Sequence, residues 1–516
     1  MSNISSGRLG YAAWAAALLV LLAAPSASLA IGSWSASPSL GAARQLHAAT
    51  LISGTRVLLA GGLSPGGPTA NSEIFDSQTR RWSQAAPLAT PRLAPVGVTL
   101  RGGRVLVAGG GAFSLTSRPS YLTSAEIYDP PSNRWLPAGN MPTARANAAA
   151  TLLADGRVLV AGGLNSFGPG LKSAEIYNPV TNSWSSAGPM AEGRFHHTAT
   201  LLPNGKVLVA GGHQLTGDGS TVALSSAELY DPVSNSWSKA PRMSVPRDNH
   251  TATPLLGGRV LIVGGGTRTA GFVRSAEVYD PAGNRWAGAG RLGDPRGFHA
   301  ATLLPGGDVL AVGGLDDCGA LSSAERFSPA TGRWARAPSL RTPRSRATAT
   351  AFADGQAVVV GGSTYVGATL RSSELLRPGG SDRTGPQMCG PSLSPLRLRP
   401  PPSGPSVGRR GLAVRYRLSE SGVVAFTVRR LMPGRLQGRR CAAARAPIPR
   451  RLRCVRPVGL RGGFSRRSRS GRNLFHFRGR IGGRTLSPGS YQLVASPRDR
   501  RRNRGVPANS GFRIVR

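Results

Sequence analysis

Residues 145–184 read RANAAATLLADGRVLVAGGLNSFGPGLKSAEIYNPVTNSW, and variants of this stretch recur along the chain. Their spacing of roughly 50 residues is typical of repeat arrays and propellers. The arginine, the Gly-Gly doublet and the tryptophan keep matched spacings. The doublets begin at Gly61, Gly109, Gly162, Gly211, Gly264, Gly313 and Gly361. The arginines are Arg44, Arg92, Arg145, Arg194, Arg247, Arg296 and Arg344, and the tryptophans are Trp34, Trp82, Trp135, Trp184, Trp237, Trp286 and Trp334.

Each repeat predicts four β-strands. Between the first strand and the apolar run Val158–Ala161 lies Asp155-Gly156, a dipeptide that favours a two-residue hairpin turn. The continuous apolar run is typical of a strand buried on both faces. Residues 173–177 alternate polar and apolar side chains, and a further turn leads to the strand that carries Trp184. Because the chain is rich in Gly and Pro and poor in charged and aromatic residues, its composition also favours an all-β fold over a helical bundle.

The double glycine, a downstream tyrosine in E-x-Y-D-P, as in Glu126–Pro130, and the spaced tryptophan resemble the kelch motif. The resemblance covers about two thirds of the chain and implies a β-propeller of four-stranded blades around a central channel. Seven doublets predict seven blades.

The two ends of the array predict how the ring closes. Residues 33–37, around Trp34, lack the three strands that precede the tryptophan in the other repeats, and the last repeat (344–378) lacks a tryptophan strand. We expect the N-terminal strand to complete the last blade, because closure removes open strand edges.

The chain outside the array predicts three further segments. Residues 1–30 have a basic start, an apolar run and a small-x-small end, which is typical of a secretory signal peptide, with an uncleaved anchor as the alternative. The propeller is assigned to residues 31–380 and a Pro/Ser/Gly-rich linker to 381–408. Residues 409–516 predict a small immunoglobulin- or fibronectin-like β-sandwich, since 486–493 resemble a tyrosine corner.

The basic charge is concentrated in the last segment. The chain has 64 Lys+Arg against 23 Asp+Glu, and residues 391–516 hold 31 Arg against only Glu420 and Asp499. Outside a cell this excess would attract anionic envelope polymers, phospholipid headgroups or extracellular DNA. Specific nucleic-acid recognition is not expected, because no stacking aromatics alternate with the arginines. Coding bias toward arginine is the alternative explanation.

Four cysteines in an exported chain predict disulfides. Cys441 and Cys454 are near neighbours in one Arg-rich segment and are expected to pair. Cys318 and Cys389 remain, and by elimination they would tie the linker to the propeller. No C-x-x-C spacing indicates a metal site.

Polar residues that occur once per repeat predict architectural roles. The repeat arginines, and a glutamate in each third strand, are expected to be paired at blade junctions, because a buried charge needs partners. Three residues after the arginine, four repeats carry a histidine on the innermost strand. These histidines are predicted to line the channel, and a metal-binding ring is the less favoured alternative. They are His47, His197, His250 and His299.

Departures from the repeat mark the candidate recognition surface. By resemblance to kelch propellers, the loops between second and third strands open onto one face, and residues 111–123 and 213–225 form the longest of them. Variable loops on a rigid scaffold are the expected place for recognition. The candidate residues on this face are Phe113, Arg118, Tyr121, Phe195, His196, His213, Asp218, Asp248, Asn249, Phe298, Asp316, Asp317 and Tyr365.

These features predict a secreted, extracellular binding protein that recognises a carbohydrate or protein partner, with the basic segment retaining it at the envelope. The alternative is a secreted propeller enzyme acting on glycans, either galactose-oxidase-like or hydrolytic. Galactose-oxidase-like enzymes use copper with a tyrosine cross-linked to a cysteine, and no such pattern is found around Cys318. A nucleophile elbow and a phosphate loop are also absent from the sequence, so no cofactor is expected. A purely structural scaffold is a third reading.

Overall fold

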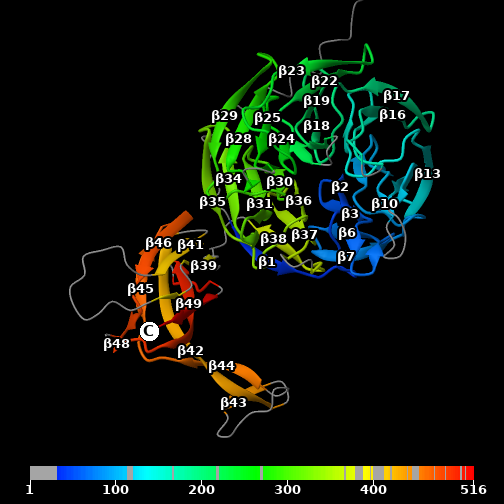
Figure 1. Ribbon diagram of the computed structural model, residues 1–516. Helices are drawn as coiled ribbons and strands as arrows, with labels where there is room; N and C mark the ends of the chain where they lie inside the picture. Colours follow the sequence, from blue (N-terminus) through cyan, green and yellow to red (C-terminus); the bar gives the residue numbers. More distant parts are fainter. Residues whose placement is uncertain are drawn as a thin grey trace, which may run out of the picture.

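The computed structural model describes residues 32–112, 120–165, 168–216, 220–267, 271–364, 368–377, 388–394, 397–398, 412–418, 421–437, 440–443, 453–469, 471–482, 484–499, 502–505 and 507–515. These residues form strands and no helix. They build a ring-shaped propeller with a smaller strand-rich unit beside it (Figure 1). Within this part of the chain, no helix is long and apolar enough to cross a membrane. The predicted signal peptide, residues 1–30, lies outside the described residues.

Seven four-stranded antiparallel sheets form the blades of the propeller. Blade 1 contains β2 (Ala48–Ser53), β3 (Arg56–Ala60), β6 (Ser72–Asp76) and β7 (Arg81–Ala85). Blade 2 contains β8 (Val96–Thr99), β9 (Val105–Ala108), β12 (Ser124–Asp129) and β13 (Arg134–Asn140). Blade 3 contains β14 (Ala149–Leu152), β15 (Val158–Ala161), β16 (Ser173–Asn178) and β17 (Ser183–Pro189). Blade 4 contains β18 (Thr198–Leu201), β19 (Val207–Ala210), β22 (Ala227–Asp231) and β23 (Ser236–Ala240).

The ring continues in the same strand order. Blade 5 contains β24 (Thr251–Pro254), β25 (Val260–Val263), β28 (Ser275–Asp280) and β29 (Arg285–Arg291). Blade 6 contains β30 (Ala300–Leu303), β31 (Val309–Val312), β34 (Ala324–Ser328) and β35 (Arg333–Ala337). Blade 7 contains β36 (Thr348–Ala351), β37 (Ala357–Val360), β38 (Ser373–Arg377) and, from the N-terminus, β1 (Ser33–Ser37).

Closure of the ring by the N-terminal strand is confirmed. β1 pairs with β38 in antiparallel register, with Trp34 opposite Leu376 and Ala36 opposite Glu374. The indole of Trp34 is buried, and its Nε1 donates to the carbonyl of Pro338 in blade 6, 2.8 Å away. The first and last segments of the propeller therefore share one sheet, and the all-β seven-bladed fold is as predicted.

The Gly-Gly doublet forms the junction between adjacent blades. At Gly162 φ is +63°, and a Cβ there would lie 2.5 Å from the carbonyl oxygen of Arg194 in the next blade. Only glycine fits so close an approach at a left-handed position. The amide of Gly163 donates to the same carbonyl at 2.9 Å, and Gly362 donates to Arg44 at 2.9 Å where blade 7 meets blade 1. The doublet therefore joins adjacent blades through backbone contacts.

The repeat arginines and glutamates are paired, as predicted. In blade 3 the guanidinium of Arg145 lies 2.6 Å from Glu175 and also donates to the carbonyls of Gly162 and Ser173. Glu175 accepts the amide of Thr143 at 3.0 Å. Both side chains of the pair are buried. Arg145 and Glu175 both belong to blade 3, and Glu175 also binds the segment around Thr143 that leads from blade 2 into blade 3.

Aromatic side chains continue the contact between blades on the outer strands. Tyr177 packs on Trp184 across β16 and β17 with ring centroids 5.1 Å apart. The indole Nε1 of Trp184 donates to the carbonyl of Ala138 in blade 2 at 2.8 Å. The Tyr177 hydroxyl donates to Asn182 in the turn between the two strands. Both polar tips are therefore satisfied while the rings fill the inter-blade core.

The four repeat histidines are buried between neighbouring blades. Nε2 of His250 lies 3.1 Å from Thr198 Oγ1, and Nε2 of His299 lies 2.9 Å from Thr251 Oγ1, each threonine belonging to the preceding blade. Burial lowers the pKa of His250 to about 3, and the charge of Arg247 acts in the same direction. These rings are therefore neutral packing groups. The four residues are His47, His197, His250 and His299.

The C-terminal unit is a β-sandwich. One sheet has the order β39 (Met388–Ser394), β41 (Leu412–Leu418), β46 (Gly471–Phe477). The other has the order β40 (Arg397–Leu398), β50 (Ala508–Ile514), β49 (Gly489–Asp499), β42 (Gly422–Gln437), β43 (Arg440–Ala443). Two further strands, β44 (Arg453–Gly459) and β45 (Phe464–Ser468), also pair with β42. A short hairpin joins β47 (Arg480–Ile481) to β48 (Arg484–Thr485).

Apolar side chains from both sheets, including Val414, Phe426 and Leu493, share one core. The hydroxyl of Tyr491 donates to the carbonyl of Ser487 at 2.7 Å, the contact that a tyrosine corner predicts.

Part of the predicted linker belongs to this sandwich. Residues 388–394 and 397–398 form β39 and β40, which pair with β41 and β50. Leu393 is buried in the sandwich core. The prediction of a linker here was wrong because the Pro/Ser/Gly composition hides strand pairing that only distant partners create.

Removing β1 should destabilise the propeller, because blade 7 would lose its outer strand and the buried Trp34. We expect a chain that starts at Pro38 to unfold at a markedly lower temperature than a chain that starts at Gly32. Loss of one buried tryptophan alone typically costs about 3–5 kcal/mol. The measurement is thermal unfolding of the two chains, and equal melting temperatures would refute closure by β1.

Acidification should destabilise the propeller through its neutral histidines. Burial holds the pKa of His47 at about 3, as for His250, whereas an unfolded histidine titrates near 6.5. Below that value the unfolded chain binds protons that the folded chain does not, so each histidine lowers the free energy of unfolding by about 1.4 kcal/mol per pH unit until its folded pKa is reached. Above pH 6.5 both states are neutral and the stability is independent of these groups.

The measurement is urea unfolding of the wild type and of the double variant His47→Gln/His250→Gln between neutral and mildly acidic pH. We expect the variant to lose less stability on acidification, while His476→Gln, at an exposed position of the sandwich, behaves as wild type. Identical pH slopes in the wild type and the double variant would contradict the assignment.

Candidate functional site

The residues two positions after the repeat arginines form a ring around the channel. All seven have a left-handed backbone, with φ between 48° and 54°. Each amide donates to the carbonyl of the equivalent residue in the preceding blade, and Leu46 donates to Arg346 to close the circle. We call this ring the mouth. Its members are Leu46, Ala94, Asn147, His196, Asn249, Phe298 and Arg346.

The mouth lies on the face that carries the loops between second and third strands. In each blade, the residue just before the mouth position bridges to the residue after the Gly-Gly doublet, as Phe195 does to His213. From there the chain forms short hairpins in five blades. These are β4 (Leu63–Ser64) with β5 (Gly67–Pro68), β10 (Gly111–Ala112) with β11 (Ser120–Tyr121), β20 (His213–Leu215) with β21 (Thr221–Ala223), β26 (Gly266–Thr267) with β27 (Gly271–Phe272), and β32 (Leu315–Asp316) with β33 (Gly319–Ala320).

A left-handed backbone costs a non-glycine residue on the order of 1 kcal/mol. Leu46, Phe298 and Arg346 accept this cost at the mouth because the ring of backbone hydrogen bonds holds them. Strained positions of this kind gather at functional sites. The ring therefore holds seven half-buried side chains at fixed backbone positions around the channel.

The seven positions are not chemically equivalent. Blades 1 and 2 contribute the apolar Leu46 and Ala94, whereas blades 4, 6 and 7 contribute His196, Phe298 and Arg346. Residues next to the ring add to the difference, because Phe195 and His213 of blade 4 and Asp248 of blade 5 lie at the bridges beside the mouth. We call the part of the mouth formed by blades 1 and 2 the plain half and the part formed by blades 4–7 the polar half, with Asn147 of blade 3 between them.

A histidine–aspartate pair lies in the polar half. Asp248, just before the mouth position of blade 5, is hydrogen-bonded to Nδ1 of His213 at the start of the blade 4 hairpin. The His213 ring meets the edge of Phe195 at 3.9 Å between centroids and lies 5.2 Å from His196. Because Asp248 occupies Nδ1, Nε2 is the nitrogen of His213 that can exchange a hydrogen bond or proton with a ligand.

The electrostatics of this cluster separate one charged group from one neutral group. Burial lowers the pKa of His196 to about 4, and His213 acts in the same direction, so His196 is neutral near pH 7. Burial by itself would raise the pKa of Asp248, but the hydrogen bond and charge of His213, together with a hydrogen bond from Asn249 and the charge of His196, outweigh it and hold that pKa below its usual range. Asp248 is therefore an ionised carboxylate, and His196 is a neutral imidazole.

Phe298 and Arg346 complete the polar half. The Arg346 guanidinium lies 4.6 Å from the centroid of Phe298, which is a cation–π contact. Phe298 also faces His196 at 6.3 Å and Phe272 of β27 at 6.5 Å. Burial lowers the pKa of Arg346, and an arginine nevertheless stays charged near pH 7. This part of the mouth offers an aromatic face and a cation side by side.

Asp316 does not join this cluster, because the sandwich binds it. Arg417 of β41 is hydrogen-bonded to Asp316 and lies 3.5 Å from Asp294, and both carboxylates are buried. Burial raises the pKa of Asp316, and the charge of Arg417 opposes that rise. Cys318 nearby is disulfide-bonded, and its predicted partner Cys389 has a side chain outside the described residues. The hairpin of blade 6 is therefore the docking point of the sandwich.

The remaining predicted residues divide into two groups. Tyr121 lies on β11 of blade 2, and Asp317 lies beside Gly271 of the blade 5 hairpin. Four others, Phe113, Arg118, Asp218 and Tyr365, lie outside the described residues.

Sequence reasoning missed Arg346 and Phe272. Arg346 occupies the same repeat position as His196 and Asn249, so comparison of that column across the repeats could have found it. His196, Asn249 and Phe298 of the same column were among the predicted residues, whereas the histidines of the following column lie buried between blades. Phe272 carries no periodic signal, since only the hairpin geometry brings it to Phe298.

Comparisons with known proteins agree with the architecture. Residues 148–362 match the KLHDC2/KLHL20/DRC7 Kelch-repeats domain, and residues 92–142 match the Kelch motif. Kelch-like protein 23 of Mus musculus and that of Homo sapiens are each 35% identical to this chain over 79 residues, which is 15% of this chain and 13% of those proteins. The chain thus spans only a small part of the length of these relatives.

A solved structure has the same fold. It is titled a novel fungal alcohol oxidase with catalytic diversity among the AA5 family, in complex with copper. The match has a TM-score of 0.53 and 19% sequence identity, and it covers 95% of this chain and 100% of that chain. At this identity the likeness concerns the fold alone.

The polar half of the mouth does not fit the copper that this title names. Copper binding needs several donor atoms directed at one point. Within the described ranges, no three His, Cys, Asp or Glu side chains are placed to hold a metal ion together.

The doublets, the paired arginines and glutamates and the matches over residues 92–142 and 148–362 agree with one another. The chain is a kelch-repeat β-propeller protein.

Proposed function

We propose that this protein is a secreted binding protein. Its propeller recognises a carbohydrate or protein partner at the polar half of the mouth, and its basic sandwich retains it at an anionic cell surface. The observation that carries the proposal is the asymmetry of the mouth. Of the seven equivalent backbone positions, blades 1 and 2 hold the apolar Leu46 and Ala94, blade 3 holds Asn147, and blades 4–7 hold His196, Asn249, Phe298 and Arg346.

The chemistry of this half suits ligand recognition. The half-buried ring of Phe298 can stack on a ligand, and Arg346 and Asp248 can form directed hydrogen bonds with it. Because these groups stand on a fixed backbone, less entropy is lost on binding. Kelch repeats support a binding role for the ring as a whole. The signal-like residues 1–30 and the disulfide between Cys441 and Cys454 support export, because disulfides persist in oxidising compartments.

Glycan hydrolysis is the second candidate, and the His213–Asp248 pair favours it. A histidine oriented by a carboxylate can act as a general base toward water. If this candidate is correct, a bound glycan is cleaved by the wild type and is bound but not cleaved by His213→Gln. If the first proposal is correct, the glycan is recovered intact from both proteins.

The mouth can be altered without changing its backbone, because asparagine tolerates the left-handed conformation and already occupies Asn147 and Asn249. We expect Phe298→Asn and Arg346→Asn each to weaken ligand binding by at least tenfold, or about 1.4 kcal/mol, with unchanged melting temperature. The measurement is binding to a glycan array and to immobilised extracellular proteins. Leu46→Asn and Ala94→Asn are the matched controls in the plain half, and equal binding by all four variants would move the site elsewhere.

Retention by the sandwich should show as salt-dependent binding to polyanions. We expect the full chain to bind soluble polyphosphate, with affinity that falls steeply as ionic strength rises, because bound counterions are released. The measurement is fluorescence anisotropy of labelled polyphosphate at increasing sodium chloride. Affinity that does not respond to salt, or no affinity at all, would contradict retention by charge.

A further inference from the structure

Strand β42 continues beyond the sandwich into a separate arm. Its first half, up to Arg430, pairs with β49 inside the sandwich, and its second half pairs with β44 and β43 (Figure 1). At residues 431–433 and 455–457 the arm is a two-stranded ribbon, since no further strand pairs with these residues in the described part of the chain. We define the arm as residues 431–437, 440–443 and 453–458.

The arm exposes apolar side chains on one face. Leu431 is opposite Pro457, and Pro433 is opposite Val455, so these four residues share a face. Val455 is 63% exposed, Pro433 and Pro457 are exposed, and Leu431 is half-buried. A two-stranded ribbon in water cannot bury its own faces and is marginally stable alone.

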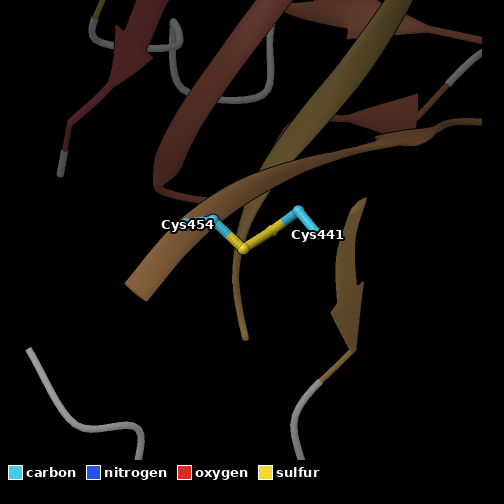
Figure 2. The surroundings of a disulfide bond; sticks show 2 residues. All are labelled: Cys441 and Cys454. Carbon is cyan, nitrogen blue, oxygen red and sulfur yellow. A yellow bond between two sulfur atoms is a disulfide. The ribbon is translucent and has the colours of Figure 1, made fainter. Parts of the chain in front are cut away.

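A disulfide holds this exposed ribbon together. Cys441 of β43 is bonded to Cys454 of β44, with the Cα atoms 5.9 Å apart (Figure 2). The pairing predicted from the sequence is therefore confirmed. The bond closes the arm covalently, so the apolar face is presented in an ordered form without a covering layer from the described residues of the chain.

Arginines flank the apolar face along the ribbon. Arg429 precedes it on β42, and Arg435 is paired with Arg453 at its far side. Between Glu420 and Asp499 the sequence contains no acidic residue. Arg430, on the other face of β42, lies over Tyr491 of the sandwich, 6.0 Å from the ring centroid. The arm thus combines an apolar stripe with positive charge at both ends.

We propose that this arm is an anchor for an anionic lipid surface. Its apolar stripe enters the headgroup region of the membrane while the flanking arginines bind lipid phosphates, which are the two components of interfacial binding. A soluble polyanion needs only the arginines and leaves the stripe in water, so the exposed stripe favours lipid. This inference rests on the proposed retention at an anionic surface and names the component of that surface.

The test uses the full chain with vesicles of phosphatidylcholine alone, vesicles of phosphatidylcholine mixed with phosphatidylglycerol, and soluble polyphosphate. We expect co-sedimentation with the phosphatidylglycerol vesicles only. Leu431→Ser/Val455→Ser should lower this partition by about tenfold and leave polyphosphate binding unchanged, because it removes apolar area and no charge. Arg429→Gln/Arg435→Gln, which removes two of the flanking arginines, should lower both.

Val423→Ser is the matched control, since Val423 is 40% exposed on the same strand within the sandwich. Pro457→Ser serves as a second apolar variant if the double variant melts below the wild type. Wild-type partition by both apolar variants would overturn the lipid anchor. Binding to polyphosphate without binding to vesicles would also overturn it while leaving retention by a polymer intact, and absence of both would overturn the anchor and the retention together.

Discussion

The structure depends on one buried arginine per blade. Its guanidinium joins the glutamate of its own third strand to the carbonyl of its own glycine doublet, and its backbone carbonyl accepts the amide of the doublet in the blade before, as Arg194 does for Gly163. A buried cation without these partners would be severely destabilising. Each arginine therefore acts within a blade and between blades at once, and this pair of contacts recurs in all seven blades.

This constraint explains where function can reside. Positions that every blade needs, such as Arg145 and Glu175, are committed to architecture. At the mouth, two residues after each repeat arginine, hydrogen bonds of the backbone fix the chain. The side chains at these positions are therefore not needed to hold the blades together. His196 and Phe298 could therefore diverge from Leu46 without disturbing the fold. The propeller is a frame whose repeated backbone carries different side chains at the mouth in different blades.

The sandwich is fixed to this frame on one side and projects away from it on the other. Arg417 reaches the buried carboxylates of Asp294 and Asp316 in blade 6, next to the disulfide-bonded Cys318. The arm that carries Cys441 and Cys454 extends from the C-terminal end of β42, beyond the part of β42 that pairs with β49 in the sandwich (Figure 1). Because Arg417 ties the sandwich to blade 6, an anchor on the arm would also hold the propeller near the surface.

The repeat determined the blade number, the strand order and the Arg–Glu pairing, because each recurs with every blade. Closure by Trp34 followed from the incomplete repeats at the two ends of the array. The repeat also indicated His196, His213 and Asp248 as departures from its pattern. It could not show that His213 bonds Asp248 or that Arg346 covers Phe298, since these partners come from different blades. Only the tertiary structure decided those contacts, because they arise when the ring closes and brings residues distant in sequence around one axis.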